Sequence, residues 1–250
     1  MSHSPFSTLF WQTVATLLRN ELRRYFFSPL VYLLTAVFLL MSGFFFVLTL
    51  KASQDAGMMR YVFSNTSVLL LLLSPLMTMG LIADERAQHT LPLLLSSPIT
   101  AFQIVFAKFS AALTVLAFLL ASTWVYPCFL YAVGQPDFWP LLTGYGGLFL
   151  MGSVFLAVGL WTSCWAKNTL VSASSAFGLS LLWWLFSSGA QTDTATQPWQ
   201  PLWRYLSLGE HQDSFLQGWF SLSDTLFYLS ALVILLGASV MAFQRQREHL

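Results

Sequence analysis

Residues 28–50 read SPLVYLLTAVFLLMSGFFFVLTL, 23 positions without one charged side chain. As a helix, this stretch rises about 1.5 Å per residue and can cross the roughly 30 Å of hydrocarbon in a bilayer. Backbone groups in lipid must satisfy their own hydrogen bonds, so a run of this kind is expected to be helical. Further uncharged, mostly apolar runs occur at residues 61–83, 109–136, 138–166, 168–192 and 225–244.

These runs predict an all-α membrane protein with six transmembrane helices in a single domain, residues 1–250. A closed barrel would need alternating polar and apolar residues, and none of the runs alternates. Charged residues make up only 8% of the chain, against about 25% in a typical soluble domain. The predicted spans are approximately residues 28–50, 61–83, 103–133, 141–164, 168–190 and 224–244.

Lys and Arg set the expected orientation, because they concentrate in cytoplasmic loops. With six spans both chain ends share one side, and if that side is the cytoplasm it holds eight of the 11 Lys and Arg residues. We therefore expect a multi-pass protein of a bacterial inner membrane with both termini in the cytoplasm. Because these cations are spread along the rim, no nucleic-acid partner is expected. The eight are Arg19, Arg23, Arg24, Arg86, Lys108, Lys167, Arg245 and Arg247.

Residues 6–27 precede the first span and show an amphipathic helical pattern. Apolar residues recur at three- and four-residue steps, with Arg19, Arg23 and Arg24 between them. A basic helix with aromatic residues on its apolar face is expected to lie in the cytoplasmic interface of the membrane. Ser28-Pro29 then ends this helix. The alternative is an unattached cytoplasmic tail.

The connection between spans 2 and 3, residues 84–108, is the most informative loop. It begins with three consecutive charged residues at 84–86, continues with polar residues to 90, and becomes apolar from Leu91 to Leu95. Thr100 followed by Gln103 is a capping-box pattern that begins the next helix. The pattern predicts a charged turn and a short amphipathic helix lying flat at the cytoplasmic surface.

Smaller features concern the shape and packing of the spans. Pro75 and Pro127 are expected to kink spans 2 and 3. Small residues at helical spacing favour close helix packing, with a conduit lining as the alternative; they are Ser172, Ala176 and Ser180 in span 5, and Gly144, Gly147 and Gly152 in span 4.

Two further features are the outer segment before the last span and the two cysteines. Residues 191–223 are rich in aromatic residues, which predicts short outer helices or a partial re-entrant hairpin anchored at the outer interface. Cys128 and Cys164 are expected near opposite membrane faces, so no disulfide is predicted.

The sequence lacks the patterns of several kinds of chemistry. No Gly-rich loop precedes a Lys-Ser or Lys-Thr pair, so no nucleotide site is expected. No His or Cys pair has metal-ligand spacing, and Glu210, His211 and Asp213 are interpreted as solvated loop residues. Every Asp, Glu, Lys and Arg is expected at a span boundary or outside, which disfavours a proton-coupled carrier. We therefore predict no catalytic residue, bound cofactor or metal, and energy that arrives through the 84–97 segment.

Three stretches of the sequence resemble a known family. They are residues 21–32 (ELRRYFFSPLVY); residues 74–79 (SPLMTM) with 83–99 (ADERAQHTLPLLLSSPI) and 103–109 (QIVFAKF); and residues 205–230, with His211, Phe215, Gly218 and Asp224 between two Tyr-Leu-Ser triplets. Together they resemble the membrane subunit of type-2 ABC exporters, in the branch of gliding-motility and nitrous-oxide-reductase-maturation permeases. The family commonly has Gly at the position of His89 and an acidic residue at the position of Pro92.

The resemblance implies a half-transporter that pairs with a second copy or a paralogue. Each half would dock a separate cytoplasmic ATPase subunit, which binds the ATP and Mg²⁺, and an accessory subunit with an outer-facing domain could join them. Residues 6–27 would be the connecting helix, with Arg19, Glu21, Arg23 and Arg24. The coupling segment would contain Asp84, Glu85, Arg86, Gln88, His89, Thr90 and Leu91, and the outer helices His211, Phe215, Gly218 and Asp224.

The function expected from these observations is export or extrusion across the inner membrane, driven by the partner's ATP hydrolysis. Motion at residues 84–97 would tilt spans 1, 2 and 5. The alternative is a membrane scaffold that relays the motion of the ATPase to an outer-facing partner without moving a substrate. An intramembrane enzyme, a third possibility, lacks the residues for catalysis. The largely apolar spans favour a lipid-like cargo or none.

Overall fold

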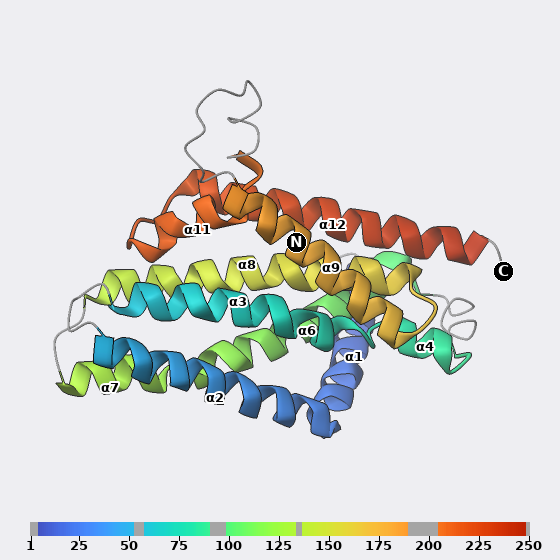
Figure 1. Ribbon diagram of the computed structural model, residues 1–250. Helices are drawn as coiled ribbons and strands as arrows, with labels where there is room; N and C mark the ends of the chain where they lie inside the picture. Colours follow the sequence, from blue (N-terminus) through green and yellow to red (C-terminus); the bar gives the residue numbers. More distant parts are fainter. Residues whose placement is uncertain (1–4, 53–57, 91–98, 134–136, 190–204, 249–250) are drawn as a thin grey trace.

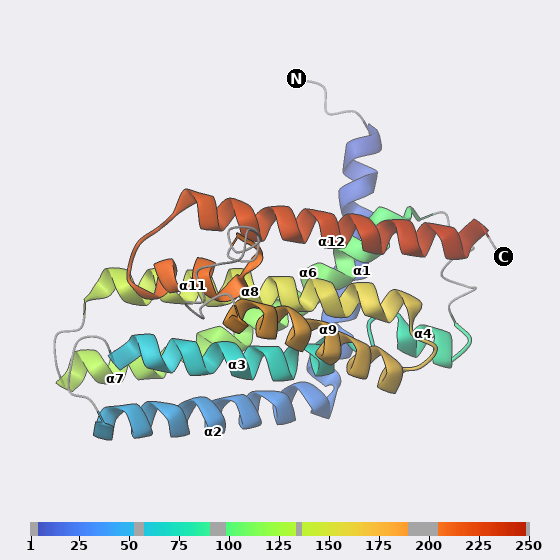
Figure 2. The same cartoon turned by 45° about the horizontal axis from the view of Figure 1, so that its top comes forward.

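The computed structural model describes residues 5–52, 58–90, 99–133, 137–189 and 205–248, and within these ranges the regular secondary structure is helical. Long apolar helices run along a common direction, and α1 crosses them at one end of the bundle (Figures 1 and 2). The elements are α1 (Pro5–Phe27), α2 (Pro29–Ala52), α3 (Met58–Thr78), α4 (Ala83–Ala87), α6 (Ala101–Ser122), α7 (Val125–Val133), α8 (Phe138–Trp165), α9 (Thr169–Gly189), α11 (Leu208–Leu216) and α12 (Leu222–Glu248).

Five segments of the described chain are long and apolar enough to cross a membrane. They correspond to predicted spans 1, 2, 3, 4 and 6. Predicted span 5 falls on α9, whose qualifying apolar part, Thr169–Leu185, is shorter than the other five, so the sixth span stays a prediction. The five segments are Pro29–Lys51, Met58–Ala87, Ala101–Ala132, Phe138–Trp165 and Leu222–Arg247.

The third predicted span is interrupted where the sequence places Pro127. Helix α6 ends at Ser122 and α7 begins at Val125. Proline has no amide hydrogen to donate to the carbonyl four residues earlier, here that of Thr123, and its ring clashes with that carbonyl. The kink predicted in span 3 is therefore confirmed as a break. Pro75, in contrast, lies inside α3, which continues to Thr78.

Helix α8 lies at the centre of the bundle and packs against α3, α6, α9, α11 and α12. A Cβ atom added to any of four α8 glycines would overlap a side chain of another element, so each glycine permits a close contact. The packing interpretation of Gly144, Gly147 and Gly152 is confirmed. The contacts are Gly144 with Phe63 of α3, Gly147 with Phe215 of α11, Gly152 with Leu116 of α6, and Gly159 with Thr78 at the end of α3.

The small residues of α9 also face the protein. Ser172, Ala176 and Ser180 are all buried, and α9 packs on α3 and α8. Their burial confirms the packing interpretation of this face. The two serine hydroxyls have no hydrogen-bond partner among the described residues.

Candidate functional site

Helix α4 lies at the end of the bundle where α1 crosses and where α12 ends (Figure 1). It follows α3 after a short turn, and the hydroxyl of Ser163 accepts hydrogen bonds from the backbone amides of Ile82 and Ala83, 3.1 Å each. Amides at the start of a helix have no partner within it, so this hydroxyl fixes where α4 begins. The acidic residues Asp84 and Glu85 occupy the first turn, where the helix dipole favours negative charge.

The end of α4 is closed by a Schellman turn. The amide of Thr90 donates to the carbonyl of Glu85 at 2.9 Å, and the amide of His89 donates to that of Arg86 at 3.1 Å. His89 has a φ of 57°, in the left-handed region that favours glycine. This conformation gives a physical reason why a glycine is suited to this position.

Asp84, the first charged residue of α4, binds α1. Its Oδ2 atom accepts a hydrogen bond from Arg24 Nη2 of α1 at 2.8 Å. The two side chains are 44% and 33% exposed, so solvent screens this ion pair. The pair joins α4 to α1 at the surface of the molecule.

Glu85, the next residue, binds α6 through a buried lysine. The Nζ atom of Lys108 donates to Glu85 Oε1 at 2.6 Å and to Glu21 Oε1 of α1 at 2.7 Å. The Lys108 side chain is only 3% exposed, and the two glutamates are 16% or less. One ammonium group therefore holds carboxylates from two different helices, α1 and α4.

Arg86, the third residue, points toward α8 and α12. Its guanidinium donates to the carbonyls of Cys164 at 2.9 Å and Ala166 at 2.5 Å, and to Gln246 Oε1 at 2.6 Å. The two carbonyls are among the last of α8, which lack partners within the helix. Gln246 of α12 also donates to the Cys164 carbonyl. Arg86 thus caps α8 and connects α4 with two central helices.

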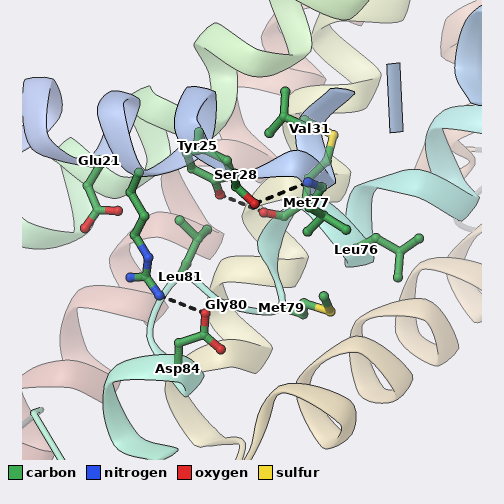
Figure 3. A pocket seen from close by; sticks show the side chains of 12 residues that line it. Glu21, Tyr25, Ser28, Val31, Leu76, Met77, Met79, Gly80, Leu81 and Asp84 are labelled. Atoms are coloured by element: carbon green, nitrogen blue, oxygen red, sulfur yellow. Dashed lines mark hydrogen bonds and ion pairs between the residues drawn. The ribbon is translucent and has the colours of Figure 1, made fainter. Parts of the chain in front are cut away.

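A further anchor holds α1 against the end of α3. The hydroxyl of Tyr25 donates to the carbonyl of Met77 at 2.7 Å (Figure 3). Burial raises the pKa of Tyr25 well above its ordinary value, so its phenol keeps the proton that it donates at physiological pH. This hydrogen bond stabilises the position of α1 beside the charged junction, by which we mean Glu21, Arg24, Asp84, Glu85, Arg86 and Lys108.

The structure brings together some of the predicted residues and not others. Arg24 of the predicted connecting helix binds Asp84 of the predicted coupling segment, and Lys108 joins Glu21 to Glu85. Arg19 and Arg23, in contrast, are exposed on α1. Gln88, His89 and Thr90 form the end of α4. Leu91 lies outside the described residues, as do Pro92 and the remainder of the predicted amphipathic helix.

Sequence reasoning missed the centre of the junction. Lys108 was interpreted only as one of the positive charges of the cytoplasmic rim, and nothing pointed to Ser163, Tyr25 or Gln246. Lys108 is separated from Glu21 by 87 residues, and Gln246 from Arg86 by 160, so no local pattern reveals these pairs. The only signal was position, because Lys108 stands two turns inside a helix that otherwise reads as apolar.

At the opposite end of the bundle, the predicted outer residues form a second cluster. His211 Nδ1 lies 2.6 Å from Asp224 Oδ1, its Nε2 lies 2.9 Å from the carbonyl oxygen of Tyr205, and its ring stacks on Phe227. The imidazole ring of His211 therefore joins the loop before α11 to the first turn of α12. Gly218 adopts a φ of 87° in the Schellman turn after α11.

The neighbouring acidic residues do not join His211 in a metal site. Asp213 lies 3.6 Å from Arg60 of α3, and both His211 nitrogens face other partners. In the ranges that the structure describes, no group of three His, Cys, Asp or Glu side chains is placed to hold a metal ion. The outer cluster therefore has the character of a structural lock between α11 and α12.

The charged junction joins four helices through one short element. Three consecutive side chains of a five-residue helix each bind a different neighbour: α1, α6, and α8 with α12. Displacement of α4 therefore acts on these four helices at once.

The comparison with curated proteins found no match for this chain. The comparison with protein families matched residues 15–247, nearly the whole chain, to the family described as ABC-2 family transporter protein. The match includes all six residues of the charged junction and the outer cluster. With most of its length matched, the chain belongs to the ABC-2 family of transporter proteins and is a non-catalytic membrane subunit of that family.

Proposed function

We propose that this chain is the membrane half of an exporter of the bacterial inner membrane, driven by a separate cytoplasmic ATPase. In this proposal α9 is the sixth span, both termini are cytoplasmic, and ATP and Mg²⁺ bind to the partner. Within the family we place it in the branch of the gliding-motility and nitrous-oxide-reductase-maturation permeases, on the resemblance of the three stretches given in the sequence analysis. A second copy or a paralogue completes the membrane part.

The observation that carries the proposal is the triple attachment of α4. A docking element must be short, must lie at the surface, and must be joined rigidly to the elements that it moves. Asp84, Glu85 and Arg86 meet this requirement with one attachment each, to α1, α6, and α8 with α12. Force applied by an ATPase at residues 84–91 would then move the bundle as a few rigid bodies rather than bend one loop.

The distribution of charge supports a cytoplasmic position for this end. Helix α12 ends here with Arg245 and Arg247 in its last turn, and α1 presents Arg19 and Arg23 on its exposed face. A Lys- and Arg-rich end of a membrane protein favours the cytoplasm. The crossing orientation of α1 (Figure 2) agrees with a helix in the membrane interface.

A relay without transport is the second candidate, and the packing of α8 favours it. Side chains of α3, α6 and α11 occupy the space beside the α8 glycines, so the centre of the bundle is closely packed. A cargo path would therefore run along an outer face of the bundle, between two copies, instead of through one chain. A relay that only moves an outer-facing partner would need no such path.

Co-purification distinguishes the candidates. The tagged full chain is extracted from its native membranes in mild detergent, and the proteins that remain bound are identified and quantified. A nucleotide-binding subunit at equal stoichiometry supports the proposal, whereas a large outer-facing partner alone supports the relay. ATP hydrolysis by the purified chain alone would refute both.

A pair of charge reversals then tests the docking element. Glu85→Lys places two cations in the buried site, and Lys167→Glu is a charge reversal of equal size and opposite sign at an exposed position on the same end of the bundle. We expect the first variant to uncouple ATP hydrolysis by the complex from its activity and the second to leave both close to wild type. Ala87→Pro should act like Glu85→Lys because it breaks α4. Full coupling in both α4 variants would contradict the assignment.

A further inference from the structure

A pocket lies between α1, the start of α2, the end of α3 and α4, at the end of the bundle where α1 crosses (Figure 3). Its volume is about 100 Å³, room for about three water molecules or a small polar group. The polar side is formed by Glu21, Arg24 and Asp84. The remaining wall is mostly apolar, with Leu30, Val31, Leu76, Met77 and Leu81.

The pocket continues into an exposed apolar strip of α3. Val68, Leu72 and Leu76 are 41%, 45% and 37% exposed and follow one another at four-residue steps, while most of their α3 neighbours are buried. Helices α2 and α9 both pack on α3. Leu76 belongs to the strip and to the pocket, so a long apolar chain could leave the pocket along α3.

The charges around the pocket do not balance. The lining and the adjoining Lys108 site contain three carboxylates, Glu21, Asp84 and Glu85, against two cations, Arg24 and Lys108. The remaining cation of the junction, Arg86, is directed to the carbonyls of α8. A ligand that carries only negative charge is therefore disfavoured here, whereas a ligand with an ammonium group next to a phosphate complements both signs.

We propose that this pocket binds a zwitterionic phospholipid of the leaflet at the α1 end, of the phosphatidylethanolamine type. The phosphate contacts Arg24, which is 44% exposed at the pocket mouth, and the ammonium group contacts the carboxylates of Asp84 and Glu21. One acyl chain lies along Val68, Leu72 and Leu76. The inference rests only on a membrane position for the bundle and does not depend on export or on an ATPase.

Occupation of the site would bear on the junction itself. The phosphate and the Asp84 carboxylate compete for the same Arg24 guanidinium. The Arg24–Asp84 pair links α1 to α4 at the partly exposed surface, and Lys108 links the same two helices through Glu21 and Glu85 in a buried position. A bound lipid would therefore weaken the surface link between α1 and α4 and leave the buried Lys108 link in place.

Headgroup selectivity of the wild-type chain is the first test. The purified full chain is equilibrated with equal amounts of phosphatidylethanolamine and phosphatidylglycerol of identical acyl chains, and the lipid retained is measured by native mass spectrometry. We expect a two- to fivefold excess of the zwitterionic lipid, about what one partly exposed ion pair supplies. Equal retention of the two lipids, or an excess of the anionic lipid, would overturn the proposal.

Two substitutions at exposed apolar positions form the second test. Leu76→Trp fills the exit of the pocket, and Val233→Trp places the same side chain on α12 at a position that is 70% exposed and not part of the pocket. With unfolding temperatures equal to wild type, we expect Leu76→Trp to lower lipid retention at least about fivefold, as for loss of a well-packed contact. Val233→Trp should retain the wild-type amount. Equal retention by the two variants would refute the site, whatever the outcome of the co-purification experiment.

Discussion

Removal of the Lys108 ammonium group should destabilise the protein strongly. In Lys108→Met the aliphatic length is kept, but the carboxylates of Glu21 and Glu85 lose the cation that lies 2.7 and 2.6 Å from them. Loss of one partner of a buried ion pair costs about 3–5 kcal/mol, because a charge stays buried without compensation. The two glutamate side chains are 16% and 15% exposed, which gives them some contact with water, so we expect about 3 kcal/mol.

The same reasoning predicts a rescue. If the cost arises from uncompensated charge, adding Glu21→Gln and Glu85→Gln to Lys108→Met should restore most of the lost free energy of unfolding. The reason is that neutral groups of similar volume replace the ions. The triple variant should therefore lie within about 1 kcal/mol of wild type, although its three changes each remove an interaction. This non-additivity separates a charge effect from a simple loss of packing.

The assay is thermal unfolding of the purified chain in one detergent, followed by the fluorescence of its 10 tryptophans. Arg24→Met serves as the control, since the Arg24–Asp84 pair is partly exposed and such pairs contribute about 1 kcal/mol or less. The expected order of unfolding temperature is wild type, then the control and the triple variant close together, then Lys108→Met. If Lys108→Met unfolds at the same temperature as Arg24→Met, or if the triple variant is the least stable, the proposed energetics of the junction are wrong.

Three further predictions test local features of the fold. His89→Gly should stabilise the chain by up to about 1 kcal/mol in the same unfolding assay, because His89 adopts a left-handed φ of 57° that costs a non-glycine residue energy; a lower unfolding temperature would contradict this. Gly147→Ala should destabilise the chain, since the new Cβ would lie 2.8 Å from Phe215 Cβ. At the adjacent Gly146 a new Cβ would have nothing within 4 Å, so Gly146→Ala should stabilise the helix by about 0.5–1 kcal/mol. Equal effects at the two positions would refute the packing argument. Arg86→Met should speed hydrogen exchange of the α4 amides because it frees α4 from α8 and α12, and unchanged exchange would show that these bonds do not hold α4.

The sequence predicted the membrane spans well where the signal was a long uncharged run. Five of the six runs correspond to segments long enough to span a membrane, and the break near Pro127 follows from a residue that cannot donate a hydrogen bond. The part of α9 that the structure describes as apolar, Thr169–Leu185, is shorter than the other five segments, and its span assignment remains a prediction. Helical packing at Gly144, Gly147 and Gly152 was also foreseen, because small residues at helical spacing have few other uses.

The charged junction was predicted only in part. Asp84, Glu85 and Arg86 were recognised as a unit, and Glu21 and Arg24 were assigned to the connecting helix through the family resemblance. The sequence did not indicate that these two groups bind each other, nor that Lys108 stands between them. From the sequence, Lys108 was counted among the charges of the cytoplasmic rim, whereas in the structure its side chain is buried.

The sequence alone determined the membrane character, the helical class and the positions where charge interrupts apolar runs. Each of these depends only on whether a local stretch of chain is more stable in water or in lipid. The tertiary structure decided which charges meet. Ion pairs such as Lys108 with Glu21 and caps such as Arg86 on α8 join residues far apart in the chain, and their partners are set by how helices cross and by which carbonyls remain unpaired at a helix end. Those choices are properties of the packed bundle, and no local segment encodes them.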